Sequence, residues 1–150
     1  MLKKVEIWTD GACSYNPGPG GWAAILNYKG IEKVFSGGAI STTNNVMELT
    51  AVIEGLKALK EPCMVTLYSD SSYVVNAISE NWLETWENNG FKTANKKPVK
   101  NRELWEELSI LLKQHKVVFV HVKGHADNEN NNRCDKIARQ EVQKFTDVPF

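Results

Sequence analysis

The hydrophobic periodicity changes partway along the chain, and this change limits the fold more than any other feature. The first part has strand-like runs that Gly, Asn and Pro residues separate. We expect these runs to form an antiparallel meander: residues 5–11, 21–30 and 32–38. From Asn45 onward the apolar positions follow helical spacing instead, and this helix ends before Pro62.

Strands and helices alternate in the rest of the chain. The apolar runs at residues 64–70 and 117–122 are typical of strands. Three further segments have helical patterns: 71–79, 103–114 and 133–145. An antiparallel start followed by this alternation predicts an α/β fold with a mixed sheet. We expect one domain over residues 1–150, with residues 146–150 as a loose tail.

The overall composition excludes several classes of protein. The 18 basic and 18 acidic residues cancel, so any nucleic-acid site must come from local clustering of charge. Cys13, Cys63 and Cys134 are odd in number and have no CxxC spacing, which argues against a disulfide framework or a zinc site. Without a signal-peptide pattern or a long apolar run, we expect a cytoplasmic protein that does not contact the membrane.

Two acids in the first half of the chain each have an ordinary structural explanation. Asp10 precedes Gly11, and an Asp-Gly pair suits the start of a turn. Glu48 lies three residues after Asn45, which is the spacing of a capping box with Asn45 as the N-cap.

Two further acids have equally simple roles when each is taken alone. Asp70 follows one predicted strand and precedes a predicted helix, where it could serve as the N-cap. Asp135 has Arg139 four residues later, which is the spacing of a surface ion pair on a helix.

The joint placement of the four acids favours a site. Asp10 and Asp70 both fall near the C-terminal ends of apolar strands, where α/β sheets place their ligands, and Glu48 and Asp135 begin helices that could lie against that edge. Unit charges about 4 Å apart repel by about 4 kcal/mol at an effective dielectric constant near 20, so a converging cluster needs cations. Carboxylates select hard ions such as Mg²⁺ or Mn²⁺, and pairs of such ions suit displacement at phosphorus.

His125 lies in a polar loop before the Asp135 helix. A histidine in an exposed loop is usually inert. Beside a phosphate group, however, an imidazole that titrates near neutral pH could carry a proton to or from the reacting groups.

Taken in order, five segments make the chain resemble the bacterial type 1 ribonuclease H family over nearly its whole length. They are TDGAC with NPGPGGW, TTNNVMEL, YSDSSYV, KTANKKPVKN and KGHADNENNNRCDKIA. The resemblance implies a five-stranded mixed sheet with flanking helices. It also implies a sequence-independent endonuclease that hydrolyses the RNA strand of RNA/DNA hybrids with two Mg²⁺ ions and leaves 5′-phosphate and 3′-hydroxyl ends. Four residues match the metal-binding acids: Asp10, Glu48, Asp70 and Asp135. His125 matches a loop histidine that assists proton transfer or product release.

The same segments predict where the RNA strand is recognised. RNA displays a 2′-hydroxyl that donates and accepts in a wide, shallow minor groove, so backbone and amide groups can distinguish it without reading sequence. Suitable partners are Gly11, Ala12, Cys13, Asn16, Asn44 and Asn45. By resemblance, Thr43 would hold a phosphate of the DNA strand, and Ser72 stands where a glutamine is common.

A basic run at residues 91–102 is the second predicted substrate surface. Together with nearby aromatic side chains it suits a phosphate backbone and sugar faces. The segment 82–102 resembles the family's basic protrusion, which grips the DNA strand; the contacts that we expect are Trp82, Trp86, Phe91, Lys96, Lys97, Lys100 and Asn101. Glu87, Asn88 and Asn89 stand where relatives often carry basic residues, so we expect hybrid binding that is weaker but still salt-sensitive.

Two other functions remain open at this point. A non-catalytic hybrid-binding module would keep the groove surface, but it has no need for four mutually repelling acids. A DNA transposase or exonuclease relative would share acids on a similar sheet, and cutting of duplex DNA would reveal it. We expect a monomer that needs no obligate protein partner.

Overall fold

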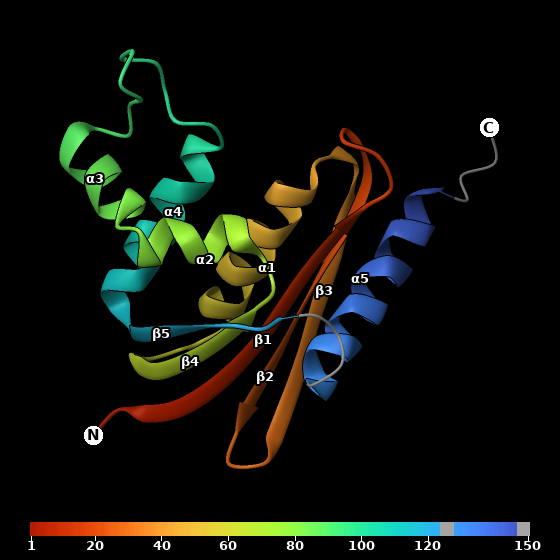
Figure 1. Cartoon of the computed structure of the whole chain (residues 1–150). Coiled ribbons are helices and arrows are strands. Elements are labelled where there is room, and N and C mark those ends of the chain that lie inside the picture. Colours follow the sequence, from red (N-terminus) through yellow and green to blue (C-terminus); the bar gives the residue numbers. More distant parts are fainter. Residues whose placement is uncertain (124–127, 147–150) are drawn as a thin grey trace.

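The structure is a computed structural model that describes residues 1–123 and 128–146. Its centre is a five-stranded sheet with the strand order β3-β2-β1-β4-β5 (Figure 1). The strands are β1 (Lys3–Cys13), β2 (Gly18–Tyr28), β3 (Ile31–Thr42), β4 (Cys63–Ser69) and β5 (Lys116–His121). The first three strands pair antiparallel, and β4 and β5 join them in parallel, so the predicted mixed sheet is confirmed.

Two local features fix the register of the first strands. The β2–β3 hairpin turns at Lys29 and Gly30, which have positive φ angles of 51° and 83°. The side chain of Asn27 accepts a hydrogen bond of 3.1 Å from the Gly30 backbone and closes this turn.

β1 and β4 pair in parallel, with Trp8 opposite Tyr68.

Helices cover both faces of the sheet (Figure 1). Their bounds are α1 (Asn44–Lys57), α2 (Ser72–Ser79), α3 (Trp82–Asn89), α4 (Arg102–Gln114) and α5 (Glu129–Thr146). Successive residues of a strand point to opposite faces. Accordingly Ile7 packs in the core beneath α1 and α4, whereas its neighbour Trp8 packs with Cys134 and Ala138 of α5.

The larger core lies between the sheet and α1. Leu49, Val52, Ile53 and Leu56 recur at helical spacing and are almost fully buried. α4 packs behind α1, and its Trp105 is fully buried with its indole N–H donating to the Tyr73 hydroxyl at 2.9 Å. This core holds the strands that carry the candidate site.

The pattern analysis missed helix α3 and placed some element ends differently. Helix α3 spans only eight residues and fully buries only Leu83, so its apolar pattern is too short to mark a helix. The predicted helices at 71–79, 103–114 and 133–145 correspond to α2, α4 and α5. Of the expected tail, Thr146 ends α5, and residues 147–150 lie outside the described residues. Within the described part of the chain, no helix combines the length and apolar character that a membrane span requires.

Candidate active site

Asp10 and Asp70 are brought together by the parallel pairing of β1 and β4. Each lies two residues beyond the paired residues Trp8 and Tyr68. The expected turn at Asp10 is wrong, because β1 continues to Cys13 and Asp10 pairs with Ala23 of β2. Asp10 is a buried acid inside a strand, with its carboxylate accepting a 2.9 Å hydrogen bond from the Gly11 backbone.

Glu48 reaches the same place from helix α1. The expected capping box is wrong, because the N-cap is Thr43, whose hydroxyl accepts a hydrogen bond of 3.2 Å from the backbone of Val46. Glu48 is therefore free of a capping role, and only 5% of it is exposed. A Cβ atom on Gly11 would lie 2.5 Å from the Glu48 backbone nitrogen, so the glycine permits α1 to approach β1 this closely.

Asp70 likewise has no capping role. The N-cap of α2 is Ser71, whose hydroxyl accepts from the Val74 backbone at 3.2 Å. Oδ1 of Asp70 is buried and has no hydrogen-bond partner among the described residues. A buried carboxylate oxygen without a partner is costly, and a bound cation would satisfy it.

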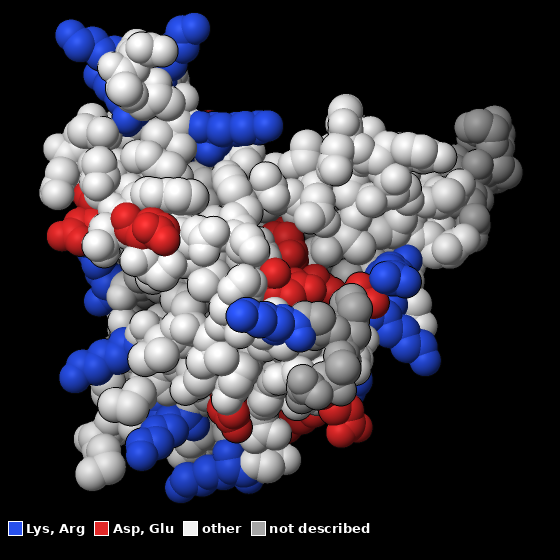
Figure 2. Space-filling model, viewed as in Figure 1, with Lys and Arg blue, Asp and Glu red and all other residues white. Residues whose placement is uncertain are grey.

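The four predicted acids line one cavity of about 400 Å³. Ligand oxygens of Asp10, Glu48 and Asp70 all lie within 4.8 Å of one another. Asp135 comes to the cavity from α5, and its predicted ion pair with Arg139 is confirmed at 3.2 Å. Figure 2 shows the acidic side chains gathered near the middle of the molecular face, with basic side chains beside them.

Burial and repulsion from neighbouring carboxylates make two of these groups, Asp10 and Glu48, weak acids. Burial, together with the charges of Asp70 and Asp135, raises the pKa of Asp10 to about 8. Burial and the charges of Asp10 and Asp70 also raise the pKa of Glu48 well above its usual value. A cavity in which Asp10 and Glu48 resist ionisation fits a hard divalent cation, which takes oxygen ligands and supplies the missing positive charge.

The predicted RNA-facing residues surround this cavity. Gly11, Asn44, Asn45 and Ser72 line it directly, and Ala12 and Cys13 line an adjoining pocket. The Asn16 side chain accepts a 2.8 Å hydrogen bond from the Asn44 backbone, which ties the β1–β2 turn to the start of α1. Thr43 lies beside them, with its hydroxyl in the helix cap.

The predicted protrusion contains two kinds of residue. Trp86 is half-buried and packs edge-on against Trp105, with the ring centroids 5.3 Å apart, and Phe91 also packs against the core. The Asn101 side chain donates to the Tyr73 hydroxyl at 3.0 Å. Trp86, Phe91 and Asn101 thus attach the segment to the core, whereas Trp82, Lys96, Lys97 and Lys100 are exposed.

Other parts of the site differ from the sequence reasoning. Ser71 and Tyr73 also line the carboxylate cavity, but a serine and a tyrosine at a helix start give no distinctive signal. Glu87 faces α4 and not the solvent: its carboxylate accepts from the Ser109 hydroxyl at 2.7 Å and pairs with Lys113 at 3.1 Å. His125 lies outside the described residues, so its role stays a prediction.

Carboxylates gathered where the parallel pairing of two strands in a mixed sheet ends suit a metal-dependent nuclease. Within that class, the chain belongs to the RNase H family, whose sequence model matches residues 2–143. The type 1 assignment made from the sequence motifs is confirmed.

Individual relatives match almost end to end. The chain is 61% identical over 142 residues to "Ribonuclease H" of Thermoanaerobacter sp. (strain X514), covering 95% of this chain and 92% of that protein. It is 59% identical over 144 residues to "Ribonuclease H" of Caldicellulosiruptor saccharolyticus, covering 96% and 99%.

Solved structures share the fold. LC9-RNase H1, described as a type 1 RNase H with the type 2 active-site motif, aligns with a TM-score of 0.85 and 25% identity over 96% of this chain and 74% of that one. LC11-RNase H1, solved with an RNA/DNA hybrid, aligns with a TM-score of 0.72 and 24% identity over 93% and 97%.

Proposed function

We propose that the chain is an endonuclease that hydrolyses the RNA strand of RNA/DNA hybrids without sequence preference, leaving 5′-phosphate and 3′-hydroxyl ends. The observation that carries the proposal is the convergence of Asp10, Glu48 and Asp70 within 4.8 Å in an open cavity that Asp135 also lines. The family membership and relatives named Ribonuclease H at about 60% identity support it.

Two Mg²⁺ ions would be held by the four acids, and Mn²⁺ could replace them. Asp70 supports this assignment because its buried Oδ1 lacks a partner among the described residues. When bound, the ions neutralise the negative charge that develops on the scissile phosphate. The raised pKa values of Asp10 and Glu48 favour the protonated carboxyl groups when no cation is bound, so cation binding should be accompanied by proton release.

Recognition of RNA would come from the groups that surround the acids. The backbone from Gly11 to Cys13 and the amides of Asn16, Asn44 and Asn45 can donate to and accept from 2′-hydroxyl groups, and Ser72 adds a hydroxyl at the cavity wall. His125 would carry a proton to or from the reacting groups.

The DNA strand would lie along a second set of residues. The Thr43 hydroxyl accepts from Val46 but keeps its own proton, which it can donate to a phosphate. Lys96, Lys97 and Lys100 can bind further phosphates, and the exposed Trp82 can pack against a sugar. Trp86, Phe91 and Asn101 would support this surface from below.

All four acids belong to one chain, so we propose a monomer with no obligate partner. We also propose the cytoplasm as its location, because the cysteines suit a reducing compartment.

The test uses three labelled duplexes of one sequence: RNA/DNA, RNA/RNA and DNA/DNA. Each is incubated with the protein in Mg²⁺ and then in chelator, beside the Asp10→Asn variant as a control. Internal cuts in the RNA of the hybrid alone, which require Mg²⁺ and Asp10, are expected. Cutting of duplex DNA would contradict the proposal, as would hybrid binding without cleavage in both Mg²⁺ and Mn²⁺.

A further inference from the structure

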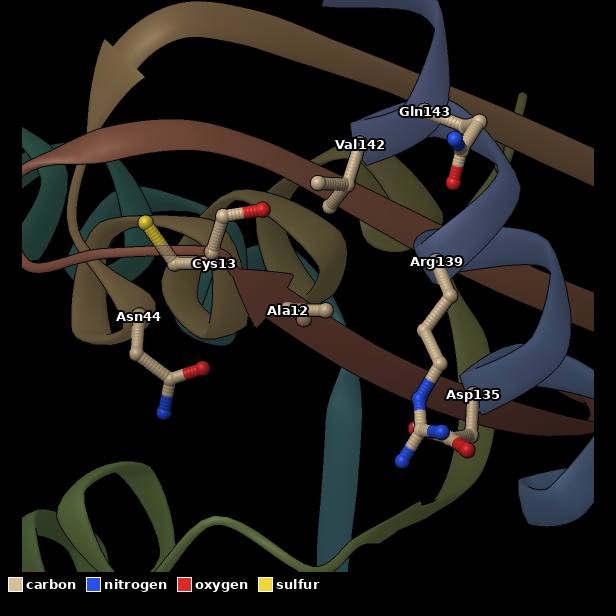
Figure 3. A pocket seen from close by; sticks show the side chains of 9 residues that line it. Ala12, Cys13, Asn44, Asp135, Arg139, Val142 and Gln143 are labelled. Carbon is tan, nitrogen blue, oxygen red and sulfur yellow. The ribbon is translucent and has the colours of Figure 1, made fainter. Parts of the chain in front are cut away.

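A second pocket, here called the α5 pocket, opens beside the carboxylate cavity. It has a volume of about 530 Å³ and is lined by Gly11, Ala12, Cys13, Ser14, Asn44, Asp135, Arg139, Val142 and Gln143. Figure 3 shows Cys13 and Asn44 on one side, Asp135 and Arg139 on the other, and Ala12 between them near the end of β1. The two hollows share Gly11, Asn44 and Asp135, so a strand that crosses the acids can continue into the α5 pocket.

The charges of the two hollows differ. The carboxylate cavity is walled by Asp10, Glu48, Asp70 and Asp135, whereas Arg139 brings a positive charge to the α5 pocket. Lys136 and Arg139 together line the surface that follows along α5. A nucleic-acid strand that leaves the acids in this direction therefore meets positive charge.

Arg139 is available to an incoming phosphate. Its Nε lies 3.2 Å from Asp135 Oδ1, and its side chain is 70% exposed. An exposed ion pair of this kind contributes little stability and is readily exchanged. The planar guanidinium has five N–H donors, so it can bind a phosphate through the donors that Asp135 does not use.

We infer that Arg139 binds a phosphate of the RNA strand adjoining the one that is cut, with that nucleotide lying in the α5 pocket. This inference rests on the proposed function, because it takes the strand over the acids to be RNA. Arg139 is then a substrate-binding residue that fixes the register of the RNA strand over the acids, in addition to pairing with Asp135.

The test measures hybrid binding in the Asp10→Asn background, so that the substrate stays intact in Mg²⁺. Arg139→Ala, Arg139→Lys and Arg133→Ala are compared by fluorescence anisotropy over a range of KCl concentrations. Arg133 is the matched control: it lies on the same helix and carries the same charge, but its guanidinium donates to Glu32 of β3 at 2.6 and 2.8 Å. Thermal melting confirms that each variant is folded.

Arg139→Ala should weaken binding roughly tenfold at low salt. It should also reduce the magnitude of the slope of log K against log [salt] by about 0.7–0.9, the value for one lost phosphate contact. Arg139→Lys should keep most of the slope, and Arg133→Ala should leave it unchanged.

Neutral methylphosphonates, placed one at a time in either strand, locate the contact. At one RNA position near the cut, the methylphosphonate should weaken binding to the chain that has Arg139. The same methylphosphonate should cause no further loss of affinity in Arg139→Ala. The inference is overturned by an unchanged slope in Arg139→Ala, by equal losses in Arg139→Ala and Arg133→Ala, or by coupling to a DNA phosphate. Hybrid cleavage by the unmodified chain is assayed in parallel: cleavage with an unchanged slope overturns this inference alone, and no cleavage overturns the proposed function.

Discussion

Asp10 lies within β1 and Asp70 directly follows the parallel strand β4, each two residues past the Trp8–Tyr68 pair. The sheet itself therefore sets their separation, and no loop movement is needed to bring them together. Because the proposed function places both acids at one cation site, Asp10→Asn or Asp70→Asn should abolish detectable hybrid cleavage while the fold stays intact. Glu54→Gln, which changes an acid paired with Lys57 on the surface of α1, is the matched control and should cleave normally. Cleavage by Asp70→Asn at the unmodified rate would remove Asp70 from the site.

Electrostatic repulsion among the four clustered acids predicts that they lower the stability of the fold when no cation is bound. In chelator, Asp70→Asn should melt several degrees higher than the unmodified chain, since 1 kcal/mol corresponds to about 2–4 °C for a chain of this size. Added Mg²⁺ should raise the melting temperature of the unmodified chain more than that of the variant; at 100 times Kd the gain is about 2.7 kcal/mol. Equal Mg²⁺ shifts in the two proteins would show that the ion binds elsewhere.

The raised pKa of Asp10 predicts a particular dependence of stability on pH. Between the ordinary pKa of 3.8 and the folded pKa of about 8, the folded chain holds more protons than the unfolded chain. In chelator, the contribution of Asp10 to the free energy of unfolding should therefore fall as the pH rises through this range. Chemical denaturation at pH 5.5 and pH 8.5 measures the effect, and Asp10→Asn should flatten it. An identical pH dependence in the two proteins would contradict the raised pKa.

The contribution of His115 to the free energy of unfolding should depend on pH in the opposite direction to that of Asp10. Its Nδ1 accepts a 3.0 Å hydrogen bond from the backbone of Cys63, and burial lowers its pKa below 6.5. The neutral ring is favoured in the folded chain, so its contribution to stability is complete above pH 6.5 and is lost as the pH falls toward the folded pKa. His115→Gln should reduce this acid sensitivity in urea titrations between pH 5 and 7, and an unchanged acid sensitivity would contradict the lowered pKa.

In the protrusion, substitutions at the neighbouring residues Glu87 and Asn88 distinguish an effect on hybrid affinity from an effect on stability. Asn88 is exposed, so Asn88→Lys should tighten hybrid binding and increase the magnitude of the salt slope by about 0.7–0.9. Glu87→Lys adds even more positive charge but breaks the contacts with Ser109 and Lys113 between α3 and α4, so it should lower the melting temperature. Anisotropy and thermal melting together distinguish the two effects, and a destabilised Asn88→Lys would contradict this placement.

Much of the fold could be predicted because strands and most helices carry their own periodicity. The three-strand meander follows from strand-like runs separated by Gly, Asn and Pro, and α1 and α5 follow from helical spacing of apolar residues. Helix α3 could not be found in this way, since it is short, fully buries only Leu83 and is held by contacts with α2 and α4.

The acids show a different limit of sequence reasoning. Taken singly, Glu48 and Asp70 suited helix caps, yet Thr43 and Ser71 take those roles. Each cap position is decided by backbone geometry within one or two residues, which composition does not reveal. What the sequence did indicate was the joint placement of the acids at strand and helix ends, because that depends on the order of elements and not on their exact bounds.

The burial of Asp10 in β1 and of Glu48 in α1 has a consequence for directed evolution of this chain. Substitutions that remove mutually repelling buried charges should stabilise the fold, and under the proposed function these particular ones end catalysis. A library selected for heat resistance alone should therefore enrich inactive variants at these two positions. A thermostable nuclease has to be sought by selecting for activity at the same time.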